Sequence, residues 1–488
     1  MGNGLERLLE INGKGSRRPN SGTTVLGRGV NLADRSKDLL ITIPDEERSG
    51  HLGCFGTTRI GKTKLMGSII EQDIPKGYNV VIIDPKGDID LFSSVIQVAA
   101  ESGRLKEVML LTPIYPDHSI RLDPLSHYYM EDELVDHVIS GIKAKEDYFI
   151  AIASEVTGAV VSGLALRAKR DGKELNTNFS DIKSRVTYND LKEFRNQLLL
   201  MKEEVPEVIE VCDNIDQILS STQEFFSKVA SSLRTMLSAL STGNTGKIIG
   251  KSYVNEFVSR FEKGEGVILY CNTGSLLARR TAHIIGRVLI SMVQSMVGRF
   301  FASGRKLDPP LCVHIDEGHN IAYTGIQEFF SKAGGANTWI SFYTQSIALI
   351  EQEIGPEAAK GILDNINNWI FMRVNHPDTA QYMEDSSPIS KKFQTIITPD
   401  ECTGRITLRE TEEQLILKAN VLQLLDRQFY MRSRGNYYKA FTLDSKPPYV
   451  EVAFPQLTGT DPHQEQRHAD HEEKEKKAAA PCLGTAAT

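Results

Sequence analysis

The segment Gly56-Thr57-Thr58-Arg59-Ile60-Gly61-Lys62-Thr63 constrains the fold of this chain more than any other. It has the spacing GxxxxGK[ST], and it lies between a strand-like run over residues 51–56 and a helical pattern over residues 63–74. The glycines permit a tight turn whose backbone N–H groups converge on a phosphate, and the following helix adds its partial positive charge. The segment therefore predicts a phosphate-binding loop between a strand and a helix.

Each residue of this loop is a candidate cofactor contact. Lys62 is expected to reach the β and γ phosphates, and the hydroxyl of Thr63 is expected to hold Mg²⁺. The cofactors predicted are ATP and Mg²⁺. The predicted cofactor-binding residues are Gly56, Thr57, Thr58, Arg59, Ile60, Gly61, Lys62 and Thr63.

A phosphate-binding loop needs a second carboxylate for its metal ion, and two candidates compete. Asp84 begins a DxxG pattern typical of GTPases, but no guanine-reading NKxD tetrapeptide follows it. Asp316 is followed directly by Glu317 after an apolar run. Such a pair suits ATP hydrolysis, because one carboxylate can hold Mg²⁺ while its neighbour orients and deprotonates the attacking water. The alternative for this pair is an acidic helix cap at the end of a strand.

Gln345 is a third candidate, at the end of a strand pattern over residues 338–346. This strand is expected beside the one that carries Asp316, where the Gln345 side chain could contact the γ-phosphate. The alternative is an ordinary glutamine at a strand end.

The chain alternates between strand and helix patterns except in one long segment. From about residue 130 to residue 246 the apolar spacing is helical and no strand pattern occurs, which predicts an all-helical insert in an α/β domain. The expected limits are residues 1–128 and 247–455 for the two parts of the α/β domain, 129–246 for the insert and 456–488 for a disordered tail. Strand patterns outside the insert cover residues 39–44, 51–56, 79–84, 107–113, 266–272, 311–317, 338–346, 368–374 and 428–433.

Charge and composition narrow the class of protein. With 56 Lys+Arg against 63 Asp+Glu the net charge is −7, so a polyanion would have to meet a local basic patch. The six cysteines are scattered without a CxxC pair, which favours a reducing compartment and no structural zinc. The apolar runs over residues 156–166 and 282–301 are too short or are interrupted by arginine, against the about 20 residues of a membrane span. We therefore expect no membrane span and a cytoplasmic location.

The ordered motifs GCFGTTRIGKTKL, VVIIDPKGD, LDPL, VHIDEGHN and YTQS, split by a helical insert, resemble those of the TraD/TraG-type coupling proteins of conjugative type IV secretion systems. These proteins belong with the FtsK/HerA translocases, and the resemblance covers roughly residues 40 to 445. It implies a RecA-like P-loop NTPase motor domain with an inserted all-α domain, assembled as a homohexamer. By position it makes Asp316 the metal-binding Walker B acid, Glu317 the catalytic base, Lys62 a catalytic phosphate contact and Gln345 the sensor.

The resemblance also implies partners. They are DNA, expected to be single-stranded and bound without sequence preference, a relaxase or relaxosome, and subunits of the secretion channel. Many members carry N-terminal membrane helices that have no counterpart in this sequence, so attachment to the inner membrane would be peripheral and through a partner. Two other functions stay open: a soluble FtsK/HerA-type translocase for DNA repair or packaging, and an ATP-binding substrate adaptor that hydrolyses poorly.

The adaptor hypothesis arises from one departure from the family pattern. Family members commonly carry an arginine, shortly after a lysine in the helix behind the Walker B strand, that reaches the ATP of the neighbouring subunit. Here Lys332 is followed by Ala333 and Gly334. Lys332 could substitute poorly because it lacks the guanidinium fork, or Arg279 and Arg280 could serve instead. A separate basic group, Arg167, Lys169, Arg170 and Lys173, predicts either a solvated helix end or a contact with DNA or relaxase.

Overall fold

The computed structural model describes residues 9–10, 22–34, 36–143, 147–398, 405–444 and 449–457. Residues 1–451 form one compact unit and residues 452–488 a second. The predicted disordered tail lies outside the described residues, apart from residues 456 and 457. The candidate site lies in the first unit.

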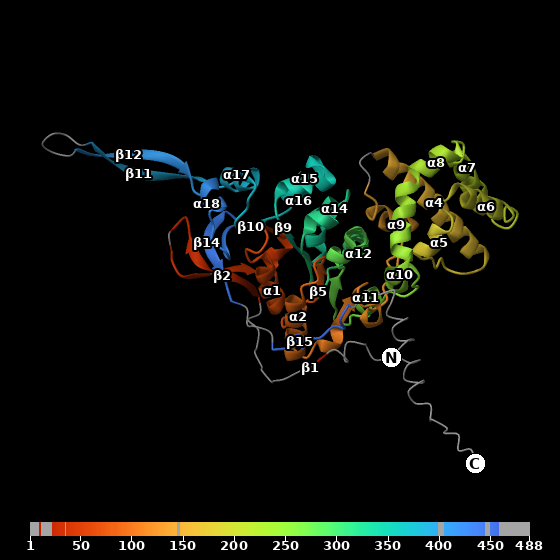
Figure 1. The fold of residues 1–488 in the computed structure, drawn as a ribbon, viewed down its shortest axis with the longest axis horizontal. Coiled ribbons are helices and arrows are strands. Elements are labelled where there is room, and N and C mark those ends of the chain that lie inside the picture. Colours follow the sequence, from red (N-terminus) through yellow and green to blue (C-terminus); the bar gives the residue numbers. More distant parts are fainter. Residues whose placement is uncertain are drawn as a thin grey trace, which may run out of the picture. The chain divides into compact units, whose positions relative to one another are not determined.

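Within the described residues, the first unit is built on a mixed sheet of eleven strands in the order β3-β2-β14-β13-β10-β4-β9-β8-β5-β7-β6 (Figure 1). From β10 to β6 all neighbouring strands are parallel, and from β13 to β3 they are antiparallel. The strands are β2 (Thr23–Asn31), β3 (Leu39–Pro44), β4 (Leu52–Phe55), β5 (Asn79–Asp84), β6 (Val108–Leu111), β7 (Ile268–Asn272), β8 (Leu311–Ile315), β9 (Thr338–Thr344), β10 (Asn368–Phe371), β13 (Gln428–Ser433) and β14 (Asn436–Thr442).

Helices fill the connections between the parallel strands, as a parallel sheet requires. Accordingly, strands β5, β8 and β9 are buried along their whole length. The helices outside the insert are α1 (Lys62–Asp73), α2 (Ile89–Glu101), α11 (Glu256–Glu262), α12 (Ser275–Ala302), α13 (Gly318–Ile321), α14 (Ile326–Lys332), α15 (Ile347–Ile354), α16 (Pro356–Asp364), α17 (Pro377–Asp385) and α18 (Lys418–Leu422). Shorter helical turns are η2 (Asp45–Gly50), η3 (Leu105–Glu107), η4 (Pro116–His118), η5 (Gly246–Gly250) and η6 (Ala333–Ala336).

Between β6 and β7 the described chain is helical and contains no strand, as the sequence predicted. Figure 1 shows α4 to α9 of this segment, coloured yellow to green, gathered into one helical group. The expected α/β fold with an all-α insert is thereby confirmed; the domain limits stay a prediction. The helices are α3 (Glu131–Ser140), α4 (Asp147–Arg170), α5 (Phe179–Lys183), α6 (Tyr188–Leu199), α7 (Val208–Ile218), α8 (Gln223–Val229), α9 (Ser231–Ser241) and α10 (Gly243–Thr245).

Two described helices, over residues 148–170 and 275–302, are long and apolar enough to cross a membrane by length and composition alone. In α12, 67% of the apolar window is buried within the protein, where residues such as Val288 and Leu289 join the main hydrophobic core. The core helix of a folded domain passes the same test of length and composition, so these two helices are weak evidence for a membrane span.

The strands predicted from sequence are all present, but others were missed. Strand β2 falls in a segment that shows little periodicity, because it contains Gly27 and Gly29. A Cβ at Gly27 would lie 2.4 Å from the carbonyl oxygen of Phe441, and one at Gly29 2.2 Å from that of Lys439. The glycines thus allow β2 to approach β14, which was also missed. A separate two-stranded sheet of β11 (Ile389–Thr398) and β12 (Arg405–Gln414) had no predicted counterpart, nor did the short β1 (Leu9–Glu10) and β15 (Glu451–Val452).

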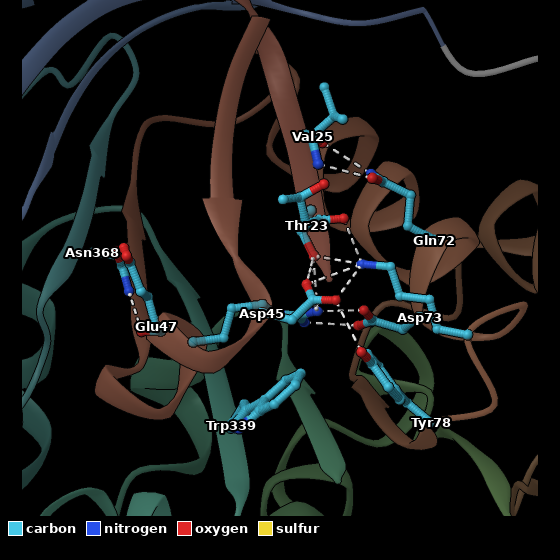
Figure 2. A network of polar contacts seen from close by, with 12 residues as sticks. Thr23, Val25, Asp45, Glu47, Gln72, Asp73, Tyr78, Trp339 and Asn368 are labelled. Atoms are coloured by element: carbon cyan, nitrogen blue, oxygen red, sulfur yellow. Dashed lines mark hydrogen bonds and ion pairs between the residues drawn. The ribbon is translucent and has the colours of Figure 1, made fainter. Parts of the chain in front are cut away.

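A buried polar network fixes η2 against α1. Arg48 makes a bidentate ion pair with Asp73, in which Nη1 contacts Oδ1 and Nη2 donates to Oδ2 at 2.8 Å. Oδ2 of Asp73 also lies 3.1 Å from Nε2 of His314. Asp45 accepts a hydrogen bond from the hydroxyl of Tyr78 at 2.9 Å. Figure 2 shows Asp45, Asp73 and Tyr78 converging beneath the strands. The network holds the C-terminal end of the helix that begins at the phosphate-binding loop.

Candidate nucleotide-binding site

The register of three parallel strands brings the predicted site residues to one edge of the sheet. Strand β9 lies between β4 and β8, with Phe55 opposite Thr344 and Phe342 opposite Ile315. The phosphate-binding loop follows β4, Gln345 follows β9, and Asp316 and Glu317 follow β8. Because the carboxyl ends of parallel strands meet at the same edge, these groups lie together.

The phosphate-binding loop has the backbone shape that its glycines predict. Arg59 (φ 63°) and Gly61 (φ 107°) are both left-handed, and Gly61 caps the start of α1. Nζ of Lys62 is buried and donates hydrogen bonds to the carbonyl oxygens of Gly56, at 2.6 Å, and Thr57, at 2.8 Å. Burial lowers the pKa of Lys62, while the charge of Glu317 acts to raise it.

Three residues far along the chain support the loop, and sequence reasoning missed them. The backbone N–H of Thr57 donates to the carbonyl oxygen of Arg373 at 2.9 Å, and Nδ2 of Asn375 donates to Oγ1 of Thr57 at 3.2 Å. The backbone N–H of Arg427 donates to the carbonyl oxygen of Ile60 at 2.8 Å. Two of these contacts are made by the backbone, which leaves no sequence signal.

Glu317 occupies a sharp turn between β8 and α13. Its φ is 46°, a left-handed conformation that is uncommon for a residue with a side chain. A Cβ at the next residue, Gly318, would lie 2.2 Å from the ring of Phe342. The glycine therefore lets the turn that carries Glu317 pack directly on β9.

Asp84 and Asp316 differ in the number of donors around their oxygens. Oδ1 of Asp84 accepts the backbone N–H groups of Lys86 and Gly87, both at 3.0 Å. Oδ2 of Asp84 accepts the backbone N–H of Asp88 and the hydroxyl of Tyr270, both at 2.6 Å. Both oxygens of Asp84 are thus occupied in shaping the turn of residues 84–88, which removes the structural basis of the GTPase interpretation.

Asp316, by contrast, has one carboxylate oxygen that accepts no hydrogen bond from the described residues. The side chain is 2% exposed, and within the described part of the chain its Oδ1 is buried without a hydrogen-bond partner. Burial raises the pKa of Asp316, and the nearby charge of Lys86 counteracts this. A buried carboxylate oxygen without a donor is a suitable ligand for a hard cation.

Lys86 contacts both candidate carboxylates, although the sequence did not predict a role for it. Its Nζ lies 2.5 Å from Oε1 of Glu317 and 3.3 Å from Oδ2 of Asp316. Burial acts to raise the pKa of Glu317, but the hydrogen bond and charge of Lys86 lower it overall. The available signal was the position of Lys86 in DPKGD, directly after a strand that ends at the same edge.

Gln345 lies where the sequence placed it and contacts the candidate base. Its Nε2 donates to Oε2 of Glu317 at 3.0 Å. Nδ1 of His319 lies 3.7 Å from the same Oε2 and bonds Oγ1 of Thr344 at 3.1 Å. Glu317 is therefore held between Lys86 on one side and Gln345 on the other.

These residues fit ATP and Mg²⁺. Oδ1 of Asp316 lacks a donor, and Thr63 lies in the first turn of α1 directly after Lys62, so both offer oxygen ligands. The loop backbone and Lys62 would hold the phosphates. When bound, Mg²⁺ would neutralise charge on the β and γ phosphates.

The three candidates for a subunit-bridging cation lie on the surface. Nζ of Lys332 is 2.5 Å from Oε2 of Glu328, and 60% of the Lys332 side chain is exposed. Arg279 and Arg280 are exposed at the start of α12. The structure does not bring any of the three together with Lys62 and Glu317 of the same chain.

Part of this chain matches a known protein family, and its fold matches solved structures. Residues 310–387, which include Asp316, Glu317 and Gln345, match the family TraG-D_C, described as the TraM recognition site of TraD and TraG. The bacterial conjugative coupling protein TrwBdeltaN70, in its unbound monoclinic form, aligns with 92% of this chain and 98% of its own length, with a TM-score of 0.62 and 15% identity. The chain has the fold of a conjugative coupling protein. The predicted resemblance to the TraD/TraG type is confirmed.

Two further solved structures show the same fold. The plasmid coupling protein TrwB in complex with ADP and Mg²⁺ covers 93% of this chain and 98% of its own, with a TM-score of 0.57 and 15% identity. VirB4 of Thermoanaerobacter pseudethanolicus covers 89% of this chain and 99% of its own, with a TM-score of 0.50 and 12% identity. No curated protein sequence matches this chain. Nucleotide and Mg²⁺ binding is thus a property of a protein with this fold.

Proposed function

We propose that this chain is an ATP-driven coupling protein, which recruits DNA with its attached relaxase and moves it towards a type IV secretion channel during conjugation. One observation carries the proposal. In a coupling-protein fold, the adjacent strands β4, β9 and β8 place Lys62, Gln345 and the Asp316–Glu317 pair at one edge of the sheet.

The roles of the residues follow from their positions. Lys62 holds the phosphates and would leave its loop carbonyl partners to do so. Thr63 and Asp316 hold Mg²⁺. Glu317 orients the attacking water and accepts its proton, which is the step that a carboxylate with a lowered pKa performs while ionised. Gln345 bonds the base and reports changes at the γ-phosphate to β9.

The remaining features of the proposal come from the family resemblance. The chain works as a homohexamer around DNA, in the cytoplasm or at the inner membrane through a partner. The match of residues 310–387 to a TraM recognition site supports contact with a relaxosome protein.

ATP turnover in the presence of DNA tests this function. The rate of phosphate release is measured for the full chain alone, with single-stranded DNA and with duplex DNA. We expect single-stranded DNA to raise the rate. Turnover that responds to neither form of DNA contradicts the motor function.

A second function, an ATP-binding adaptor with little hydrolysis, is favoured by one observation. Ala333 and Gly334 stand where the arginine is expected, and the preceding Lys332 is held in an ion pair with Glu328 on its own helix. The adaptor predicts tight ATP binding with negligible turnover at every protein concentration. Turnover per subunit that rises with protein concentration supports a shared site and excludes the adaptor.

A further inference from the structure

The start of α12 is an exposed turn of mixed apolar and basic character. Leu276 is 90% exposed and Leu277 67% exposed, although leucine usually lies inside a fold. Arg279 and Arg280 follow, both exposed, and within the described residues no ion pair joins either of them to a carboxylate. We call residues 275–280 the leucine–arginine turn.

The backbone separates this turn from the rest of α12. Gly274 is left-handed (φ 69°), and Ala278 has non-helical angles (φ −143°, ψ 65°) inside the helix. A helix that continued without a break would keep the two leucines and the two arginines of this turn in helical register with the rest of α12. The break instead detaches the leucine–arginine turn from the buried part of α12, which begins at Ala282.

One hydrogen bond ties the leucine–arginine turn to the turn of residues 84–88, and residues 272 and 273, which precede the leucine–arginine turn, add two further contacts. The backbone N–H of Ser275 donates to the carbonyl oxygen of Pro85 at 2.7 Å, and that of Thr273 donates to the carbonyl oxygen of Asp84 at 3.3 Å. A Cβ at Gly87 would lie 2.5 Å from the amide oxygen of Asn272. Close packing thus joins the turn of residues 84–88 to the end of β7, and the hydrogen bond from Ser275 joins it to the leucine–arginine turn, so a shift of Ser275 is passed to Pro85.

Lys86 lies within the second turn and completes the connection. Its side chain leaves the turn of residues 84–88 and contacts Oε1 of Glu317 and Oδ2 of Asp316. A continuous path of packed and hydrogen-bonded groups thus runs from the leucine–arginine turn through Pro85 and Lys86 to Glu317.

Extending the proposed function, on which this inference rests, we propose that the leucine–arginine turn contacts the DNA strand and transmits DNA binding to Glu317 through Lys86. The chemistry fits a single strand. The two guanidinium groups match phosphates, and the two leucines offer apolar surface to unstacked bases. Lys86 acts as a positioning residue, because its ammonium group contacts the carboxylates of Asp316 and Glu317. DNA bound at the leucine–arginine turn would move the turn that carries Lys86, and so change this contact.

The contact is tested with the full-length double variant Arg279→Ala/Arg280→Ala, using oligo-dT as the probe. The slope of log affinity against log salt should become shallower by about 1.4, since each lost phosphate contact on a single strand contributes about 0.7. The ratio of DNA-stimulated to unstimulated turnover should fall towards one. The matched control, Lys192→Ala/Lys202→Ala, removes two exposed basic residues of the helical insert to which no contact is assigned, and it should keep the wild-type slope and ratio.

The relay is tested separately with Lys86→Met, which should bind oligo-dT with wild-type affinity while losing stimulation. Lys86→Arg should restore part of the stimulation, because it keeps the cation between the carboxylates. A Lys86→Met variant that keeps the wild-type stimulation ratio overturns the relay.

The outcomes separate this inference from the function on which it rests. If wild-type turnover does not respond to DNA, the proposed function fails. If wild type responds and the double arginine variant keeps its salt slope, only the contact surface is wrong. A third outcome is that the double variant keeps its DNA affinity but loses turnover, and that mixing it with Glu317→Gln subunits restores turnover. In that case the arginines serve the ATP of a neighbouring subunit, and the proposal is overturned.

Discussion

The ammonium nitrogen of Lys86 lies 2.5 Å from Oε1 of Glu317, at the point where two acidic residues follow each other in a buried turn. Two adjacent carboxylates raise each other's pKa unless a cation compensates. Lys86 supplies that cation, and it keeps the candidate base ionised while burial raises the pKa of Asp316.

Replacing Lys86 by methionine should therefore raise the pKa of Glu317. The base acts only when deprotonated, so the acid limb of the pH–rate profile should move to higher pH, with little change well above it. The profile is measured without DNA for wild type, Lys86→Met and the exposed control Lys64→Met. An unshifted acid limb in Lys86→Met contradicts the role of the ion pair.

Replacing Lys62 by alanine should weaken ATP binding. Hydrogen bonds to charged groups contribute about 1.5–3 kcal/mol, which corresponds to a roughly 10- to 100-fold loss of affinity. Lys64, two residues along α1, is exposed and provides the matched control. Equilibrium titration with a fluorescent ATP analogue should show the loss in Lys62→Ala and near wild-type affinity in Lys64→Ala; equal affinities would show that the loop binds without its lysine.

Replacing Gly318 by alanine should lower the free energy of unfolding by about 1–3 kcal/mol, because the added methyl group collides with the buried ring of Phe342. Gly298 lies within α12, and a Cβ added there would meet no other described atom within 4 Å, so Gly298→Ala should be neutral or should stabilise by up to about 1 kcal/mol. Urea denaturation measures both. A Gly318→Ala variant as stable as wild type would mean that the turn does not pack on β9.

Replacing Arg48 by alanine should cost about 3–5 kcal/mol, because Asp73 would be left as an unpaired buried charge. Burial acts to raise the pKa of Asp73, but Arg48 lowers it well below its ordinary value. The stabilisation from this carboxylate is thus complete above its unfolded pKa of about 3.9 and is lost as pH falls through the folded pKa. Urea denaturation between about pH 5 and pH 3 should show a shallower decline for Asp73→Asn than for wild type. Parallel declines would exclude Asp73 as a source of the acid sensitivity.

The sequence predicted the parallel half of the sheet well, since β5 and β8 are apolar runs with clear ends and the loop at Gly56–Thr63 fixes where β4 stops. It could not predict β2, whose Gly27 and Gly29 serve a close approach to a strand about four hundred residues away. The site was predicted where side chains carry the chemistry, as in Lys62 and Glu317. It was missed where a backbone group or a long-range contact does so, as with Arg427 and the placement of Lys86.

The hydrolysis rate of Glu317→Gln tests the central claim most directly. Glutamine keeps the size of the side chain and its contact with Gln345 but cannot accept a proton from water. We expect ATP binding to remain and turnover to fall by about 10²- to 10⁴-fold, the usual contribution of a general base. A Glu317→Gln variant that hydrolyses ATP at the wild-type rate would contradict the assignment of this edge of the sheet as a catalytic site.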